Sequence, residues 1–325
     1  MTEAIQTAGL DVKGLNHQLE RVSNHLNSVI LGKPDVIQKV LVALLSKGHL
    51  LIEDVPGVGK TTLARSLAGV LDCQFQRVSF TSDLMPSDIL GVTIFNRNDN
   101  TFYFQEGPIF TNILLADELN RTTPKTQSAF LEAMEAGQVT VEKKTHSLPE
   151  PFLVMATQNP LEFSGTFPLP VSQLDRFLMR ISIGYPSPED EEKILVQYRA
   201  NRYADGQAKS VSLTEIRQCQ AAVPMIRMDD SLVVYITRLA LKTREHREIQ
   251  LGVSPRATLG LQRASQAQAL LAGRDYVAPD DIQEMVASVW AHRIIMTNQA
   301  GVGTQAYDQS VDVIDQIVAE TPVPV

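Results

Sequence analysis

The feature that most constrains the fold of this chain is the stretch LLIEDVPGVGKTTLA at residues 50–64. It opens with an apolar run, 50–52, of the kind found in strands buried on both faces of a parallel sheet. A glycine-rich turn follows, and then apolar residues recur with the spacing of a helix that has one apolar stripe. A strand, a glycine loop and a helix N-terminus in this order form a phosphate cradle, because backbone N–H groups and the positive end of the helix dipole point into one small space.

The loop therefore predicts a site for a nucleoside triphosphate. Lys60 would lie on the β- and γ-phosphates, and the Thr61 hydroxyl would hold Mg²⁺. The general pattern, GxxxxGK(S/T), has glycine where this chain has Asp54. An ordinary glycine turn between a strand and a helix remains the alternative for the loop taken alone. The residues expected to bind the nucleotide here are Pro56, Gly57, Val58, Gly59, Lys60, Thr61 and Thr62.

Two later apolar runs end in polar side chains. Residues 113–116 are followed by Asp117 and Glu118, and residues 152–157 lead to Asn159. Buried parallel strands deliver functional groups at their carboxyl ends, where the sheet opens to ligand. We expect Asp117 to hold Mg²⁺ through water, Glu118 to polarise the attacking water, and the Asn159 amide to bind the γ-phosphate or that water. An acidic pair that begins a loop is common in other proteins, and so is an asparagine before proline. The evidence for a catalytic site is that both follow a glycine loop in one chain.

Composition excludes several other classes of protein. The 325 residues suffice for two domains, and 44% hydrophobic with 20% charged residues is a globular composition. The formal net charge of −8 argues against a protein whose main role is to bind nucleic acid. The N-terminal residues do not resemble a signal peptide and no apolar run has the length of a membrane span, so we expect a cytoplasmic protein. The two cysteines and six histidines lack metal-ligand spacing, which leaves Mg²⁺ as the only expected metal.

The chain changes character near residue 185. Residues 1–184 read as an α/β domain, with one β-hairpin at about 91–106 and a second at about 138–149. Pro86 is expected to break a helix within 82–91. Residues 29–31 would lie against an adenine ring or in the core. From 185 to 325 we expect helices only, the last at 310–320, so the predicted fold is an α/β P-loop core with a parallel sheet, inserted hairpins and an all-helical C-terminal domain.

Arg256 stands out within the helical part. The Ser254-Pro255 pair is typical of a helix start and places Arg256 in the first turn. A cation there opposes the helix dipole. An anionic partner explains the position better than helix stability does, although a solvated arginine is the simpler alternative.

Several long runs together resemble the MoxR family of AAA+ ATPases. They are FTSDLMPSDILG (80–91), QEGPIFTNILLADELNRTTPKTQSAFLEAMEAGQVTV (105–141), LPEPFLVMATQNPLEFSGTFPLPVSQLDRFLMRISIGYPS (148–187) and SPRATLGLQRASQAQALLAGRDYVAPDDI (254–282). The resemblance extends over nearly the whole chain from about residue 20. It implies a ring, usually a hexamer, with ATP bound between subunits, a helical lid domain at 185–325, and hairpins that face the pore or substrate side.

The resemblance also implies roles for individual residues. The loop around Lys60 and Thr61 matches Walker A, Asp117 with Glu118 matches Walker B, and Asn159 matches sensor 1. Arg176 matches the finger that reaches into the next subunit's site, and Arg256 matches sensor 2 of the lid. Arg180 is the runner-up for the finger, but its position in a strand favours a structural role. Asp54 is common in this family's loop.

The expected function is that of a MoxR-type ATPase that remodels or matures partner proteins, or loads a metal or cofactor into them. The resemblance implies that some of these clients carry a von Willebrand factor A domain. Two alternatives stay open on the sequence alone. One is a DNA or RNA motor, since hairpin-bearing relatives include helicases, although the acidic balance argues against it. The other is a nucleotide-gated scaffold with little turnover.

Overall fold

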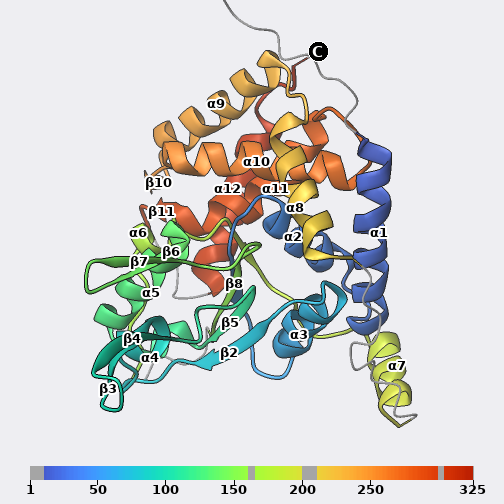
Figure 1. Cartoon of the computed structure of the whole chain (residues 1–325). Coiled ribbons are helices and arrows are strands. Elements are labelled where there is room, and N and C mark those ends of the chain that lie inside the picture. Colours follow the sequence, from blue (N-terminus) through green and yellow to red (C-terminus); the bar gives the residue numbers. More distant parts are fainter. Residues whose placement is uncertain (1–10, 160–164, 200–210, 299–303, 325) are drawn as a thin grey trace, which may run out of the picture.

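A five-stranded parallel sheet forms the centre of the computed structural model, which describes residues 11–159, 165–199, 211–298 and 304–324 (Figure 1). Neighbouring strands pair in parallel in the order β2-β5-β8-β1-β9. The carboxyl ends of β1, β8 and β5 are therefore adjacent, as the predicted fold class requires. The strands are β1 (Leu50–Glu53), β2 (Phe75–Ser79), β5 (Ile113–Asp117), β8 (Leu153–Gln158) and β9 (Met179–Ile181).

Alternate residues of each strand enter two different hydrophobic cores. In β1, Leu50 and Ile52 belong to one core and Leu51 to the other, because successive side chains of a strand point to opposite faces. The first core is closed by α1 (Val12–Val29), α2 (Pro34–Leu45) and α3 (Lys60–Val70). The second is closed by α4 (Pro86–Leu90) and α5 (Pro124–Ala136). Burial on both faces explains why the strands appear in the sequence as unbroken apolar runs.

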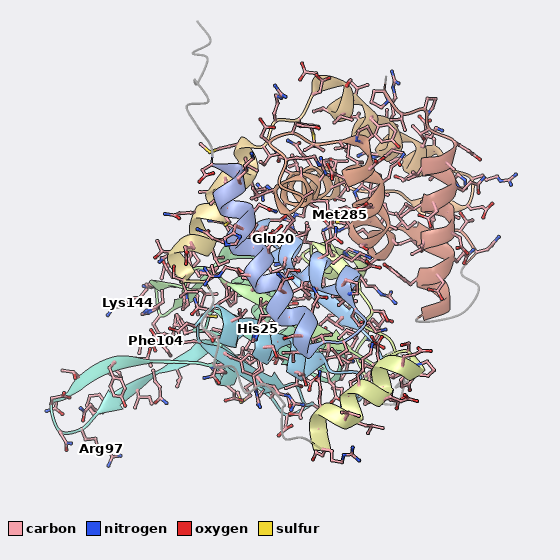
Figure 2. All side chains as sticks on the ribbon, turned by 90° about the vertical axis from the view of Figure 1, so that its right-hand side faces the viewer. Glu20, His25, Arg97, Phe104, Lys144 and Met285 are labelled. Atoms are coloured by element: carbon pink, nitrogen blue, oxygen red, sulfur yellow. The ribbon has the colours of Figure 1, made fainter. Side chains whose placement is uncertain are left out.

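Two antiparallel hairpins leave the sheet, as predicted. The first is β3 (Gly91–Asn96) with β4 (Thr101–Glu106), and the second is β6 (Gln138–Val141) with β7 (Lys144–Ser147). Figure 2 shows the first hairpin extending away from the body, with Arg97 near its tip. Phe104, nearer its base, stacks on His146 of the second hairpin with ring centroids 4.1 Å apart. The two hairpins are thus in contact with each other.

The C-terminal part is a helical lid, also as predicted. The lid shares the first hydrophobic core with the α/β part, because buried residues of α8 and α10 join those of α1 and α2 in that core. Ser212 and Ser254 cap α8 and α10 by accepting from the backbone N–H three residues ahead. The helices are α7 (Pro188–Arg199), α8 (Leu213–Ala222), α9 (Asp230–Glu245), α10 (Pro255–Leu271), α11 (Pro279–Trp290) and α12 (Thr304–Ala319), with short 3₁₀ turns η2 (Val223–Met225) and η3 (Ala291–Arg293).

Three local predictions were wrong. The lid is not entirely helical, since β10 (Ile249–Leu251) pairs antiparallel with β11 (Ile295–Met296), and strands of two or three residues are too short to show a period. Pro86 begins α4 instead of breaking a helix, because the first helical position does not use the N–H that proline lacks. The last helix begins at Thr304, earlier than predicted, and its Tyr307 ring lies 3.7 Å from the Arg180 guanidinium.

The structure favours the core interpretation of residues 29–31, because Ile30 is buried in the first core with Val29 packed against it. Cys73 and Cys219 form no disulfide. None of the described helices has the length and apolar character needed to cross a membrane.

The two-core arrangement predicts unequal effects for two phenylalanines. Phe130 is fully buried in the second core, 5.2 Å from the Phe80 ring centroid, whereas Phe102 on the first hairpin is 70% exposed. Phe130→Ala should lower the free energy of unfolding by about 3–5 kcal/mol because it leaves a cavity. Phe102→Ala should change it by less than about 0.5 kcal/mol. Urea denaturation of both variants checks this, and equal losses would contradict the assignment of the hairpin to the outside of the core.

Candidate functional site

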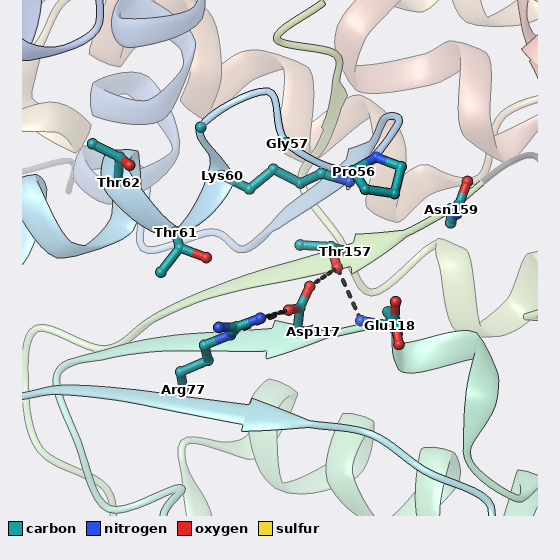
Figure 3. Close-up of a pocket in the computed structure, with 11 residues that line it drawn as sticks. Pro56, Gly57, Lys60, Thr61, Thr62, Arg77, Asp117, Glu118, Thr157 and Asn159 are labelled. Atoms are coloured by element: carbon teal, nitrogen blue, oxygen red, sulfur yellow. Dashed lines mark hydrogen bonds and ion pairs between the residues drawn. The ribbon is translucent and has the colours of Figure 1, made fainter. Parts of the chain in front are cut away.

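A cavity of about 350 Å³ opens at the carboxyl ends of β1, β5 and β8 (Figure 3). Its volume is in the range of small-molecule sites. It brings together the predicted loop residues, both predicted carboxylates and Asn159. Val58 is the exception, because its side chain packs against the first hydrophobic core. The lining residues are Pro56, Gly57, Gly59, Lys60, Thr61, Thr62, Arg77, Asp117, Glu118, Thr157 and Asn159.

The glycine loop has the shape of an anion cradle. Gly57 and Gly59 have φ of +88° and +95°, a region that favours glycine. A Cβ atom placed on either glycine would meet nothing within 4 Å, so the hollow of the loop is open there. Helix α3 begins at Lys60, directly after the loop, and directs its N-terminal N–H groups to the same space. The loop therefore fits a phosphate group.

Lys60 is held inside the cavity by the loop itself. Its Nζ donates a hydrogen bond to the Asp54 carbonyl oxygen at 2.6 Å. Burial lowers the pKa of the Lys60 ammonium, and the carboxylates of Asp54, Asp117 and Glu118 oppose that shift. The ammonium thus has a backbone partner that it can exchange for a phosphate oxygen without a change of charge.

Asp54, which replaces the glycine of the general pattern, ties the loop to the end of β9. Its buried Oδ2 accepts hydrogen bonds from Ser182 Oγ at 3.1 Å, Ile183 N at 2.5 Å and Gly184 N at 2.8 Å. A carboxylate oxygen can satisfy three donors at once, which a glycine cannot do. The start of the loop is therefore fixed to the segment that leads into the lid.

Thr157 connects Asp117 and Glu118, the two predicted carboxylate residues. Its hydroxyl donates to Asp117 Oδ1 at 2.6 Å and accepts from the Glu118 backbone N–H at 2.9 Å. Arg77 Nη2 donates to the other oxygen of Asp117 at 2.5 Å. Glu118 itself has φ of +59°, a conformation that is rare for a residue with a side chain and that often marks a functional position. Its Oε2 pairs with Arg121 Nη1 at 2.8 Å.

Sequence reasoning missed Thr157 and Arg77. Thr157 ends the run 152–157 that leads to Asn159, and a hydroxyl at the end of an otherwise apolar strand was the signal that could have identified it. Arg77 lies between Gln76 and Val78 in β2, and its closeness to Asp117 depends on the pairing of β2 with β5. That pairing is not visible in the order of the elements along the chain.

The site fits Mg²⁺. Thr61 and Asp117 both line the cavity with oxygen donors, and Mg²⁺ is bound by one or two protein oxygens with waters and substrate phosphates. Among the described residues, no group of three or more histidine, cysteine or acidic side chains could hold a metal ion. A dedicated all-protein metal centre is therefore not seen in that part of the chain.

The predicted arginines lie elsewhere. Arg176 and Arg256 line a second cavity, of about 430 Å³, formed by the ends of α2 and α5 together with α10. Glu135 stands between them: Arg176 Nη1 lies 3.0 Å from its Oε2, and Arg256 pairs with its Oε1. The Ser254 Oγ that caps α10 also lies 3.3 Å from both Asp175 carboxylate oxygens. Arg256 is not among the residues that line the first cavity, and its predicted role in nucleotide binding stays a prediction.

Arg180 has a structural role. It is largely buried in an ion pair with Glu53 at 2.9 Å, and its guanidinium faces the Tyr307 ring. Burial raises the pKa of Glu53, an effect that the charge of Arg180 opposes. An arginine that is largely buried and paired within its own chain fits the structural role better than that of a finger.

His49 anchors the C-terminal end of α5 beside the second cavity. Its Nδ1 accepts from the Val154 N–H at 3.1 Å, which leaves the proton on Nε2, 3.1 Å from the Met134 carbonyl oxygen. That carbonyl is one of the last four of α5, which have no partner within the helix. Burial lowers the pKa of His49 to about 4.

Comparisons with known proteins give a consistent result. The family described as "ATPase family associated with various cellular activities (AAA)" matches residues 49–179, and the family "AAA lid domain" matches residues 241–316. Protein YeaC of Bacillus subtilis is 45% identical over 96% of both chains. The chaperone MoxR1 of Mycobacterium tuberculosis is 41% identical, over 87% of this chain and 77% of its own. A crystal structure from Cytophaga hutchinsonii, 34% identical, superposes with a TM-score of 0.86 over 97% of both chains.

The hydrogen bonds of Asp54 lead to a prediction about stability. Asp54→Gly restores the general loop pattern, yet it should lower the free energy of unfolding by about 2–4 kcal/mol, because buried N–H groups lose their acceptor. Asp54→Asn keeps one acceptor oxygen and should lose less. Urea denaturation of the three chains measures the difference, and a glycine variant as stable as the original would refute the anchoring role.

His49 predicts a dependence of stability on pH. The unfolded chain takes up a proton on this histidine near pH 6.5, whereas the folded chain does so only near 4. The neutral His49 therefore contributes fully to the free energy of unfolding above pH 6.5, and this contribution is lost as the pH falls from 6.5 to about 4. The free energy of unfolding should decrease by about 2 kcal/mol from pH 7.5 to 5 on account of this group. Urea denaturation across that range should give a shallower slope for His49→Gln, and equal slopes would count against the assignment.

Proposed function

The chain belongs to the MoxR family of AAA ATPases, and on that premise we propose that it hydrolyses ATP and uses the energy to remodel, mature or load partner proteins. The observation that carries the proposal is the cavity at the sheet edge, where a phosphate cradle, a lysine, two carboxylates and an amide meet. Phosphoryl transfer needs groups that position the phosphates and neutralise charge, and the cavity supplies both.

Each residue has a distinct task in this proposal. The loop N–H groups bind the phosphates, and Lys60 moves from the Asp54 carbonyl to the β- and γ-phosphate oxygens. Glu118 accepts a hydrogen bond from the attacking water and orients it, while Asn159 donates its amide to the γ-phosphate. Mg²⁺, when held by Thr61 and Asp117, would neutralise the charge that develops on the transferred group. Thr157 holds Asp117 and Glu118 in fixed positions relative to each other through its two hydrogen bonds.

The two arginines of the second cavity suggest how the site is completed. An arginine that stabilises the transition state is worth about 10³ to 10⁵ in rate, yet Arg176 and Arg256 lie apart from the lining of their own subunit's cavity. We propose that they reach the γ-phosphate bound by the neighbouring copy in a ring, most simply a hexamer. Assembly and hydrolysis would then depend on each other.

The partner proteins are also part of the proposal. The relative MoxR1 is named a chaperone, and the first hairpin, which contacts the second, exposes the side chains of Phe95 and Phe102. We propose that they contact the client, which by family resemblance can carry a von Willebrand factor A domain. Capture of clients by a Glu118→Gln chain held in ATP is the direct test of this part.

Substitution of Glu118 should separate binding from turnover. Glu118→Gln keeps the size of the side chain and removes its basicity, so phosphate release should fall by at least about a hundredfold while ATP still binds. The control is Glu132→Gln, an exposed position on α5. Steady-state phosphate release and titration with labelled ATP give the two values. Equal turnover in the original and the Glu118→Gln chains would favour a nucleotide-gated scaffold over an enzyme.

The action of Arg176 between subunits has its own test. Arg176→Ala should bind ATP but turn over about 10³-fold or more slowly, and Lys60→Ala should fail to bind ATP. A mixture of the two variants contains interfaces with an intact Lys60 and an intact Arg176, so it should recover part of the activity. A mixture as inactive as its components would argue against action across the interface.

A further inference from the structure

Glu135 engages both arginines of the second cavity at once. Each of its carboxylate oxygens meets a different guanidinium, Arg176 at 3.0 Å on Oε2 and Arg256 on Oε1. The groups are only partly buried: the side chains of Arg176, Glu135 and Arg256 are 28%, 35% and 51% exposed. An anion that arrives from outside can therefore reach the two arginines, and it would meet this carboxylate there.

Local helix stability does not explain this arrangement. Glu135 lies in the last turn of α5, where a negative charge opposes the helix dipole, and Arg256 lies in the first turn of α10, where a positive charge opposes it. The backbone beside Glu135 is fixed, because His49 bonds the Met134 carbonyl and Gly137 ends the helix with φ of +63°. Two residues that are each unfavourable in their own helix are thus held where they pair with each other.

The wall of the same cavity carries a further unpaired donor. Arg293 of η3 is buried, and its Nη2 donates to the Phe177 carbonyl oxygen at 2.5 Å. Its Nη1 has no hydrogen-bond partner among the described residues and lies 3.5 Å from where a Cβ of Gly260 would be. Arg293 Nε also lies 3.5 Å from Asp175 Oδ1, so the arginines of this cavity already face two carboxylates, Glu135 and Asp175. The Nη1 N–H group remains a buried donor for a further acceptor.

We propose that Glu135 is an intramolecular competitor for the γ-phosphate of the neighbouring subunit. This inference rests on the proposed function, in which Arg176 and Arg256 act across the interface. Guanidinium groups recognise carboxylate and phosphate oxygens with the same paired geometry. Glu135 occupies the two arginines while the adjacent site holds no triphosphate, and it releases them when the γ-phosphate arrives.

Competition of this kind makes ring assembly selective for the triphosphate state. An ADP-bound neighbour offers no γ-phosphate in place of Glu135, so the arginines keep their intramolecular partner. Partly exposed ion pairs are weak, and two of them shift a competing equilibrium by about 2- to 30-fold. The competitor is therefore strong enough to bias assembly and weak enough to be displaced.

The test uses Glu135→Gln, which keeps the shape of the side chain and removes its charge. The subunit concentration that gives half-maximal ATP turnover should fall by about 2- to 30-fold. Sedimentation velocity in ATP, in a Glu118→Gln background that does not hydrolyse it, should show the same shift in assembly. Glu132→Gln, three residues earlier on α5, is the matched control and should behave as the original chain.

A double-variant experiment separates competition from an indirect effect. In a chain with Arg176→Ala and Arg256→Ala, the further change Glu135→Gln should alter assembly no more, because the competitor then has nothing to occupy. The proposal is overturned if Glu135→Gln shifts assembly equally with and without the two arginines. It is also overturned if the original chain is active and the Glu135→Gln chain assembles only as well as the original, or less well. If the original chain neither assembles nor hydrolyses ATP, the proposed function fails and this inference falls with it.

Discussion

Burial of the central sheet on both faces is the constraint on which the rest of the molecule depends. Because helices cover both sides, polar groups can leave the sheet only at the strand ends, and the parallel order β5-β8-β1 brings three such ends together. The glycine loop, the Asp117-Glu118 pair and Asn159 are therefore neighbours in space although about a hundred residues separate the first from the last. The cavity results from the topology more than from any single contact.

The hydrogen bonds of two side chains, Thr157 and Asp54, fix the shape of the cavity. Thr157 links both carboxylate positions through one hydroxyl, and Asp54 links the loop to the segment after β9. Neither group needs to touch a substrate to matter, because an error of about 1 Å in a catalytic constellation is costly. Asp54 also joins the glycine loop to Gly184, the residue from which the chain turns towards the lid.

Much of this was predictable from the sequence, and the exceptions have physical causes. Strands buried on both faces, the helix start at Ser254 and the loop around Lys60 are local signals that the sequence displays directly. The position of Arg77 beside Asp117 requires the strand order, and the early start of α12 requires the contact of Tyr307 with Arg180. The partnership of Glu135 with two arginines was equally hidden, because an exposed glutamate near a helix end usually indicates nothing more than a solvated side chain.

Helix α5 spans the distance between two different functional regions. It begins at Pro124, a few residues after Glu118, and ends at Ala136, next to Glu135 and immediately before the second hairpin. Thirteen residues of α-helix measure about 20 Å and bend little over that length. Such a helix moves as one rigid body, so a tilt at the end near Glu118 must appear at the end near Glu135 as well. In the ring that we propose, this helix would carry a movement at Glu118 to the arginines that pair with Glu135.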